Sequence, residues 1–349
     1  MTAALTLAGG PIVATSSTRS QGVSLPPPGH LPANLLKLSA RQANVLVVDL
    51  ARSRLYVFAR LDGRLRLMRD RYVSTGRNGA AKRSEGDQRT PVGVYFTTGR
   101  ISAAELPDQY GTGALPVNYP NEWDLRHGRT GYGIWIHGMP GDSAARAPRA
   151  SDGCIVLSNN DMSHLWELVG DAETPVIIAD GLRWVSPDHM TGRADEVEAA
   201  ILRWVTDWQG LDHEAYAGHY ARELRVDALV RSLGQPTRTS CDGVPRLRSE
   251  DRPRLADERL IGTYTRCLRV GIEDFSIFAY PGESDTVMVT FDHDPPGSGL
   301  FGPVHMRQFW KLEADGRWRI VFEGPVLPGP DQLRGIPYSA RTGFAQLVR

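Results

Sequence analysis

The sequence predicts two domains, a mostly β domain followed by an α+β domain. Its 349 residues are enough to build two ordinary hydrophobic cores. Short apolar runs separated by turn residues dominate the chain as far as position 182, which is typical of strands. From residue 194 onward a helical pattern comes first and strand patterns follow, which is the order of an α+β fold.

The segment 1–43 is predicted to lie outside both cores. Residues 1–18 are uncharged and rich in Ala and Thr, and they resemble the later part of a secretory signal, although no basic residue precedes them. A disordered leader is the alternative interpretation. Residues 24–32 are rich in proline and favour an extended tether.

The segment 44–182 carries the pattern of the first domain. Residues 45–50 and 55–58 are largely apolar runs suited to buried strands. Residues 77–89 are polar and basic, so we predict an exposed loop, with the wall of a cleft for an anionic peptide as the alternative. Ser158 is predicted to cap a helix that packs one apolar face on the sheet.

The segment 183–193 is predicted to be an exposed linker, because Pro187 and Gly192 interrupt regular structure. Asp195 is expected to cap the first helix of the second domain, since apolar residues follow it at helical spacing. The second domain is predicted to span residues 194–349. An exposed linker implies that the two domains fold independently.

Composition excludes some functions and leaves others open. The 40 basic and 40 acidic residues balance, so no overall field favours nucleic acid, and no apolar run approaches the length of a membrane-spanning helix. The three cysteines show no zinc spacing, and we expect neither a metal nor another cofactor. Cys241 and Cys267 are either a disulfide pair or two unpaired thiols.

Cys154 and His137 are the candidate catalytic pair. Each adjoins a short apolar run, and a loop rich in Gly, Ala, Pro and Arg separates the two. Two neighbouring strands joined by a loop would bring them together, and an imidazole within hydrogen-bond reach makes a thiolate available at neutral pH. Gly153 permits a tight turn that aims the amides around Cys154 at a developing oxyanion.

The sequence around these residues resembles that of the L,D-transpeptidase catalytic domain, the YkuD family. The chain reads I-H-G at His137 and S-x-G-C-I at Cys154, preceded in order by V-V-D-L, L-Y-V-F, V-S-T-G and T-P-V-G. The resemblance implies a mostly β domain that forms a cysteine acyl-enzyme on peptidoglycan stem tetrapeptides. The phrase W-K-L-E-A-D-G-R-W-R-I-V-F-E resembles the NTF2-like domains attached to cell-shape-determining L,D-carboxypeptidases, so the second domain is expected to be NTF2-like.

The resemblance implies a role for each site residue. Cys154 attacks the substrate, His137 accepts the thiol proton and later returns it to the leaving amine, and the amides of Gly153 and Cys154 hold the oxyanion. Ser151 is expected to orient the imidazole or the loop. Residues expected to contact substrate are Gly138, Asp152, Tyr119, Trp123 and Tyr132. For the three aromatic residues, packing beneath a long loop is the alternative interpretation.

Two departures from the family pattern concern substrate contacts. Many family members carry a second histidine where this chain has Asp152. Many also carry an arginine two residues after the cysteine, where this chain has Val156. The cation that would hold a substrate carboxylate is therefore missing from its usual place. His127 and Asp124 are not at motif positions and are predicted to lie at the surface.

The predicted function is that of a peptidoglycan L,D-transpeptidase in the periplasm or cell envelope. With water as acceptor, the same site would be an L,D-carboxypeptidase or amidase that trims stem peptides. A non-catalytic wall-binding protein that uses the NTF2-like pocket is the alternative from another class. A homodimer formed through the C-terminal domain is a further possibility.

Overall fold

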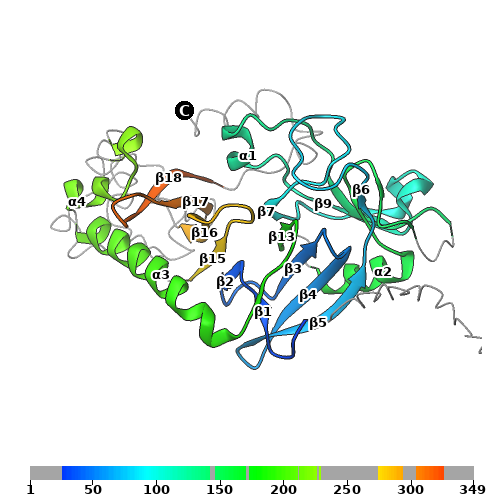
Figure 1. Cartoon of the computed structure of the whole chain (residues 1–349), viewed down its shortest axis with the longest axis horizontal. Helices are drawn as coiled ribbons and strands as arrows, with labels where there is room; N and C mark the ends of the chain where they lie inside the picture. The colour runs from blue at the N-terminus through cyan, green and yellow to red at the C-terminus, as the bar shows by residue number, and fades with distance from the viewer. Residues whose placement is uncertain are drawn as a thin grey trace, which may run out of the picture.

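The computed structural model describes residues 26–141, 146–169, 173–210, 212–225, 228, 274–293 and 304–325 (Figure 1). The predicted leader at 1–18 and both Cys241 and Cys267 lie outside these residues, so their interpretation stays a prediction. Strands predominate among the described elements, which confirms the predicted mostly β character. No helix in this part of the chain combines the length and apolar character that crossing a membrane requires.

The elements of the first part of the chain are, in order, β1 (Leu31–Pro32), β2 (Leu35–Lys37), β3 (Asn44–Asp49), β4 (Arg54–Leu61), β5 (Arg64–Tyr72), β6 (Thr75–Gly76), β7 (Gly93–Phe96), β8 (Ile101–Ser102), the 3-10 helices η1 (Ala103–Glu105) and η2 (Asp108–Tyr110), β9 (Gly113–Pro116), α1 (Glu122–Arg126), β10 (Trp135–His137), β11 (Arg149–Ser151), β12 (Ile155–Val156), α2 (Asn159–Leu168) and β13 (Pro175–Ala179). Those of the second part are β14 (Trp184–Val185), α3 (Pro187–Gly210), α4 (His213–Gly218), the 3-10 helix η3 (Arg222–Leu224), β15 (Phe275–Ala279), β16 (Thr286–His293), β17 (Val304–Leu312) and β18 (Trp318–Pro325).

A central sheet with strand order β5-β4-β3-β13-β7 organises the first part of the chain. Residues 45–48 of β3 form a continuous apolar run, which suits a strand with both faces covered. Leu46 and Val48 point to one core, whereas Val45 and Val47 point to another. This alternation follows from the two-residue period of a strand.

The first core lies between the central sheet and a second sheet, the site sheet, with strand order β12-β10-β9-β8. Helix α2 packs into the same core through Met162 and Leu165. Ser158 caps this helix as predicted, since its hydroxyl accepts a hydrogen bond from the amide of Asp161 at 3.1 Å. The site sheet is thus held firmly against the central sheet.

A C-terminal sheet with strand order β18-β17-β16-β15-β2 covers the other face of the central sheet. Figure 1 shows this sheet between α3 and the central sheet. Its outer face packs on α3 and α4 through Trp204, Tyr216 and Trp310. Its inner face joins the central sheet in one continuous core, which includes Phe278 and Phe309.

Helix α1 adds polar and aromatic contacts to this junction between the two parts. The Trp123 ring stacks on Phe309 with ring centroids 5.2 Å apart. Glu122 forms an ion pair with the fully buried Arg307 of β17. The two parts therefore share a core and ionic contacts, which does not agree with the independent folding expected from the sequence.

The predicted tether and linker both contain regular structure. Strand β2, inside the predicted segment 1–43, forms the edge of the C-terminal sheet, and Leu35 is fully buried in the shared core. Helix α3 begins at Pro187, inside the predicted linker, because proline is favoured at the first position of a helix. Gly192 lies within this helix and does not break it.

Asp124 was expected at the surface, and this expectation was wrong. The carboxylate is fully buried and pairs with Arg129 at 2.8 Å. It also accepts a hydrogen bond from the Asn121 amide at 3.1 Å, which closes the first turn of α1. Burial raises the pKa of Asp124 above its usual value, although Arg129 acts in the opposite direction.

Candidate active site

Strands β10 and β12 bring the predicted catalytic pair to one end of the site sheet. The two strands are parallel neighbours, and His137 pairs with Val156. Cys154 comes immediately before β12, two residues ahead of that partner. The apolar residues Ile136 and Ile155 are buried beneath the site and fix both strands in place. The predicted arrangement of two neighbouring strands joined by a loop is therefore confirmed.

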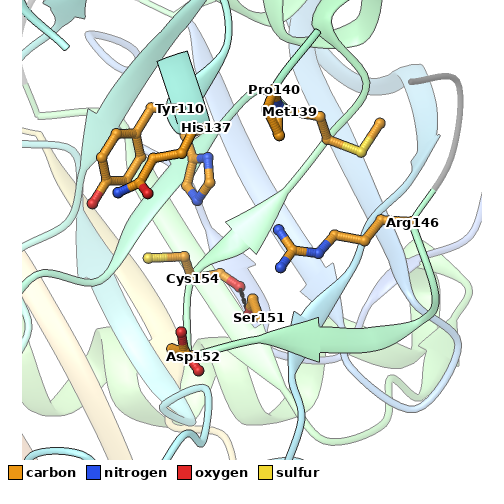
Figure 2. Close-up of a pocket in the computed structure, with 9 residues that line it drawn as sticks. Tyr110, His137, Met139, Pro140, Arg146, Ser151, Asp152 and Cys154 are labelled. Carbon is orange, nitrogen blue, oxygen red and sulfur yellow. Dashed lines mark hydrogen bonds between the residues drawn. The ribbon is translucent and has the colours of Figure 1, made fainter. Parts of the chain in front are cut away.

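The pair faces a cavity of about 420 Å³. Figure 2 shows the imidazole of His137 pointing toward Cys154 from the opposite wall. The residues that line the cavity are Gln109, Tyr110, His137, Met139, Pro140, Arg146, Ser151, Asp152 and Cys154. The structure thus gathers four of the predicted site residues and adds others that the sequence analysis did not select.

His137 is held as a neutral imidazole. Its Nδ1 lies 2.6 Å from the carbonyl oxygen of Gly138, so the ring proton resides on Nδ1 and Nε2 carries the lone pair. The ring also meets Tyr110 edge to face, with centroids 5.0 Å apart. Burial lowers the pKa of His137 to about 4, and the nearby Arg146 charge acts in the same direction. Nε2 is therefore available as a base at neutral pH.

Cys154 is held as a protonated thiol. Burial raises its pKa to about 11, and the neighbouring Asp152 charge adds to this effect. A hydrogen bond from the Trp135 amide acts in the opposite direction without reversing the shift. The thiol donates a hydrogen bond to the carbonyl of Gly133, with the sulfur and oxygen 3.4 Å apart. Bringing the thiol proton to His137 therefore requires rotation of the cysteine side chain.

Ser151 orders the loop that carries the cysteine. Its hydroxyl donates to the carbonyl of Cys154 at 2.6 Å and accepts from the amide of Gly153 at 3.2 Å. The Ser151 carbonyl accepts from the amide of Arg77 at 2.9 Å. Of the two roles expected for Ser151, these contacts support orientation of the loop. Because the Gly153 amide is engaged with Ser151, the Cys154 amide is the better candidate for the oxyanion donor.

Gly153 is required by its backbone conformation. Its φ of +125° lies in a region that residues with a side chain rarely adopt. A Cβ atom at this position would also stand 2.8 Å from the carbonyl oxygen of Arg89. The close approach lets the Gly153 carbonyl accept a hydrogen bond from Thr90 at 2.9 Å.

Thr90 and Asn159 are positioning residues that the sequence analysis missed. The buried Thr90 hydroxyl also accepts a hydrogen bond from the Gly76 amide at 2.9 Å. It therefore links the V-S-T-G and T-P-V-G segments to the loop that carries the cysteine. The Asn159 side-chain oxygen accepts from the Met139 amide at 3.0 Å, and its nitrogen donates to the Gly141 carbonyl at 2.8 Å. Thr90 belongs to the T-P-V-G phrase, but one sequence does not reveal its partner.

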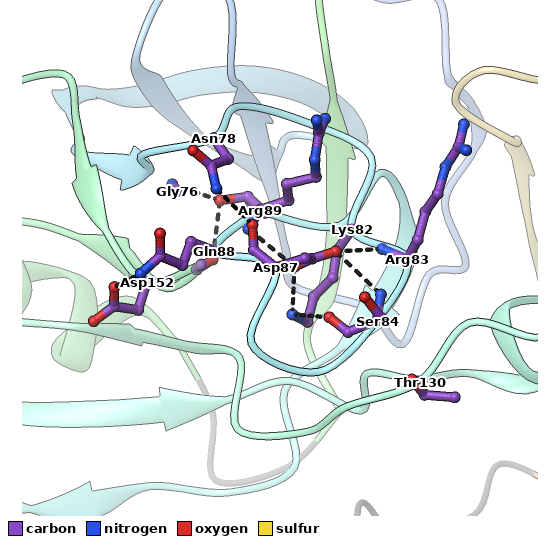
Figure 3. Close-up of polar contacts among 12 residues, drawn as sticks. Gly76, Asn78, Lys82, Arg83, Ser84, Asp87, Gln88, Arg89, Thr130 and Asp152 are labelled. Atoms are coloured by element: carbon purple, nitrogen blue, oxygen red, sulfur yellow. Dashed lines mark hydrogen bonds and ion pairs between the residues drawn. The ribbon is translucent and has the colours of Figure 1, made fainter.

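The basic loop at 77–89 is ordered around one carboxylate (Figure 3). Asp87 accepts from the buried Lys82 ammonium at 2.8 Å, and it also accepts from backbone amides of the loop at 2.7 to 3.1 Å. Burial would raise the pKa of Asp87, but these hydrogen bonds together lower it to about 2. The predicted exposed loop is therefore a compact structure, which presents Arg77 and Gln88 to Asp152.

Asp152 lies at the rim of the cavity. Its carboxylate pairs with Arg77 at 2.8 Å and accepts from the Gln88 amide at 3.1 Å. The side chain is 72% exposed, so an arriving substrate can reach it. Asp152 remains a substrate-contact candidate on this geometry.

The other predicted substrate contacts do not line the cavity. Tyr119 is buried in the first core, where its hydroxyl donates to the Thr130 carbonyl at 3.0 Å. Trp123 is buried in the core shared by the two parts, and Tyr132 is largely exposed and is not one of the lining residues. Gly138 contributes through its carbonyl, which fixes the His137 tautomer. Aromatic residues near a motif suit a core as well as a cleft, so the sequence did not separate the two.

The described residues contain no group of three or more His, Cys, Asp or Glu side chains placed to hold a metal ion. The described lining residues offer a thiol, an imidazole, a guanidinium and a carboxylate. This set fits nucleophilic catalysis with a general base.

Comparison with known proteins agrees with the site. Residues 43–178 match the family model of the YkuD domain, the L,D-transpeptidase catalytic domain. This part of the chain is therefore an L,D-transpeptidase catalytic domain, and both Cys154 and His137 lie within it. No curated protein matches the chain.

Two solved structures share the fold across both parts of the chain. Bd1075 of Bdellovibrio bacteriovorus aligns with a TM-score of 0.64 and 23% identity, covering 85% of this chain and 98% of that protein. The helical cell shape determining protein Pgp2 from Campylobacter jejuni aligns with a TM-score of 0.59 and 22% identity, covering 84% of this chain and 95% of Pgp2. The shared fold thus extends beyond the catalytic domain into the C-terminal sheet.

Proposed function

We propose that this protein is a peptidoglycan L,D-transpeptidase of the cell envelope that acts through a cysteine acyl-enzyme on stem tetrapeptides. The observation that carries the proposal is the cavity shared by Cys154 and His137 within an L,D-transpeptidase catalytic domain. A wall-binding protein without activity would not need a nucleophile and an unprotonated base in one cavity. The catalytic roles of the two residues belong to this proposal.

Acylation begins when the thiol turns from Gly133 toward His137. The Cys154 sulfur attacks the carbonyl carbon of the L-centre before the terminal D-residue, and the thiol proton passes to Nε2 of His137. Burial lowers the pKa of His137 and raises that of Cys154, so proton transfer between the resting groups is unfavourable. The proton therefore moves as the carbon–sulfur bond forms. The Cys154 amide stabilises the oxyanion.

Collapse of the tetrahedral intermediate breaks the carbon–nitrogen bond. The leaving amine takes the proton from His137, and a thioester remains on Cys154. An acceptor amine then attacks the thioester carbonyl and gives its proton to His137. The thiolate leaves and recovers that proton, which restores the resting pair and completes an amide cross-link.

Hydrolysis is the second candidate, with water in place of the amine. The observation that favours it is the likeness, over 84% of this chain, to a protein described as determining helical cell shape. A wall enzyme that changes cell shape has to alter the cross-linking that is available, and trimming a tetrapeptide to a tripeptide does so. Both reactions use the same acyl-enzyme, so the nature of the acceptor decides between them.

Mass analysis of purified stem peptides after incubation with the full chain tests this proposal. A cross-linked product supports transfer, a tripeptide alone supports hydrolysis, and an unchanged tetrapeptide contradicts both. Cys154→Ala should abolish either product, and His137→Ala should lower the rate by ~10²- to 10⁴-fold, the usual contribution of a general base. The matched control is His164→Ala, because His164 is exposed on α2 and does not line the cavity.

A further inference from the structure

Arg146 is the one lysine or arginine among the described residues that line the cavity. It follows the loop after β10 and lies ahead of β11. Figure 2 shows its guanidinium pointing into the cavity, toward the side where His137 and Cys154 stand. Its charge acts on the pKa of both residues, which places it near the reacting atoms.

The position of Arg146 is fixed at its two ends. The Tyr72 hydroxyl on β5 donates to the Arg146 carbonyl at 2.6 Å, and Nη2 of Arg146 donates to the Ala150 carbonyl at 2.6 Å. A guanidinium has five N–H donors, so this bond orients the group and leaves further donors for a ligand. A side chain held in this way loses little freedom when it binds an anion.

The charge of Arg146 is not neutralised by an ion pair with any carboxylate in the described part of the chain. The other charged residue of the lining, Asp152, pairs with Arg77 instead. Lys82, whose charge also acts on Cys154, pairs with Asp87 at 2.8 Å. An anionic group that enters the cavity therefore meets Arg146 as its natural partner.

The proposed donor carries such an anion close to the bond that breaks. In a tetrapeptide, the terminal residue leaves as an amine that bears an α-carboxylate, and only three covalent bonds separate that carboxylate carbon from the attacked carbonyl carbon. Standard bond lengths place the two carbons within about 4 Å of each other. The planar guanidinium fork matches a carboxylate in geometry as well as in charge.

We propose that Arg146 binds the terminal α-carboxylate of the donor peptide and so restricts cleavage to the last residue of the stem. This inference rests on the proposed function. It also explains how a chain with Val156 at the usual arginine position supplies a cation to the cavity from a different loop. A peptide bond inside a longer stem has no carboxylate at this distance and is rejected.

The test compares two forms of one donor, the tetrapeptide with a free terminal carboxylate and the same peptide ending in a carboxamide. The full-length protein should prefer the free acid, and Arg146→Ala should lose ~10- to 100-fold in kcat/KM on the acid, the range for a hydrogen bond to a charged group. The same variant should change turnover of the carboxamide by less than about threefold, because the carboxamide has no charge to lose. Arg146→Lys keeps the positive charge but lacks the planar guanidinium. Its kcat/KM on the free acid should lie between those of the unaltered protein and Arg146→Ala.

Arg149→Ala is the matched control, because Arg149 is exposed on β11 and does not line the cavity. It should leave both substrates unaffected. An equal loss on acid and carboxamide in Arg146→Ala would show that Arg146 only orders the loop and would overturn the inference. Equal turnover of the two donors by the unaltered protein would overturn it as well. Failure of the proposed function gives a different result, in which the unaltered protein consumes neither donor.

Discussion

Cys154 and His137 form an uncharged pair in the resting protein. Burial lowers the imidazole pKa to about 4 and raises the thiol pKa to about 11, so neither group is ionised near neutral pH. The thiol hydrogen bond to Gly133 keeps the sulfur-bound proton of Cys154 turned from His137. We infer that a bound substrate, which displaces water and offers a carbonyl, is needed to bring the two together.

The rate at which iodoacetamide alkylates Cys154 should therefore rise with pH across the whole range from about pH 6 to about pH 9. The expected slope is up to ~10-fold per pH unit, because the thiolate fraction grows until the pH reaches the thiol pKa. Intact-protein mass spectrometry measures this rate, and Cys154→Ala corrects for labelling of Cys241 and Cys267. A rate that is already constant from about pH 5 would show a thiolate–imidazolium pair and contradict this description.

The sequence predicted the two reactive residues correctly as neighbours, but it did not predict the whole lining. Cys154 and His137 adjoin short apolar runs that favour strands, and the structure pairs those strands as neighbours. Arg146 lies three residues before Arg149, and nothing in the local sequence distinguishes it from a solvated side chain. Trp123 was assigned to the cleft and lies in a core, since burial of an aromatic ring depends on what packs against it.

The loop at 77–89 shows how one carboxylate organises a segment without regular structure. Asp87 accepts hydrogen bonds from the buried ammonium of Lys82 and from several backbone amides of the loop. The loop in turn holds Asp152 at the cavity rim through Arg77 and Gln88. Loss of this carboxylate should therefore loosen the rim as well as the loop.

Asp87→Asn should destabilise the protein at neutral pH, and the loss should shrink in acid. The folded-state pKa of Asp87 is depressed from 3.8 to about 2. Its contribution is fully present above the unfolded-state pKa and is lost as the pH falls through the folded-state pKa. Urea unfolding of both proteins near pH 6 and near pH 2.5 measures the difference.

The control for this measurement is Asp180→Asn, because Asp180 is exposed after β13. It should change stability little at either pH. An Asp87→Asn deficit of the same size at both values of pH would mean that the carboxylate charge plays no part in ordering the loop.

Elements with a local signal were predicted well, and elements defined by distant pairing were not. Helix α2 has an N-terminal cap and an apolar face within a few residues, so its pattern was sufficient. Strand β2 spans only three residues, Leu35–Lys37, and its partner β15 lies more than two hundred residues further along the chain. From the sequence alone, Pro187 could equally be part of a linker or the first residue of a helix, and the structure shows that it begins α3.

The two parts of the molecule share one core between the central and C-terminal sheets. Val45 and Phe58 from the central sheet meet Phe278 and Phe309 from the C-terminal sheet in this core. Each such side chain contributes roughly 1.5–3 kcal/mol by its burial. The predicted boundaries at 182 and 194 separate segments that both contribute to this core, and the NTF2-like character of the second part stays a prediction.

We accordingly expect the fragment 44–182 to be unstable by itself, in contrast to the independent folding that the sequence indicated. Removing the C-terminal sheet and β2 exposes one whole apolar face of the central sheet. Urea unfolding and binding of a hydrophobic dye, compared between the fragment and the full chain, measure this effect. In the full chain, Trp123→Ala should lower the free energy of unfolding by ~3–5 kcal/mol. The two parts should still unfold in a single transition, with its midpoint at a lower urea concentration. A fragment as stable as the full chain would refute the shared core.

The pairing of β2 with the C-terminal sheet also governs when the molecule can finish folding. Asn34, next to β2, donates a hydrogen bond to the carbonyl of Ala279, 245 residues further along the chain. A ribosome that adds 5–20 residues per second needs roughly 10–50 s to produce that partner after Asn34 has been made. Until then the C-terminal sheet cannot cover Leu35, and one face of the central sheet stays exposed to solvent. The cavity is thus encoded early in the chain, but its support is completed only after the strands of the C-terminal sheet have been made.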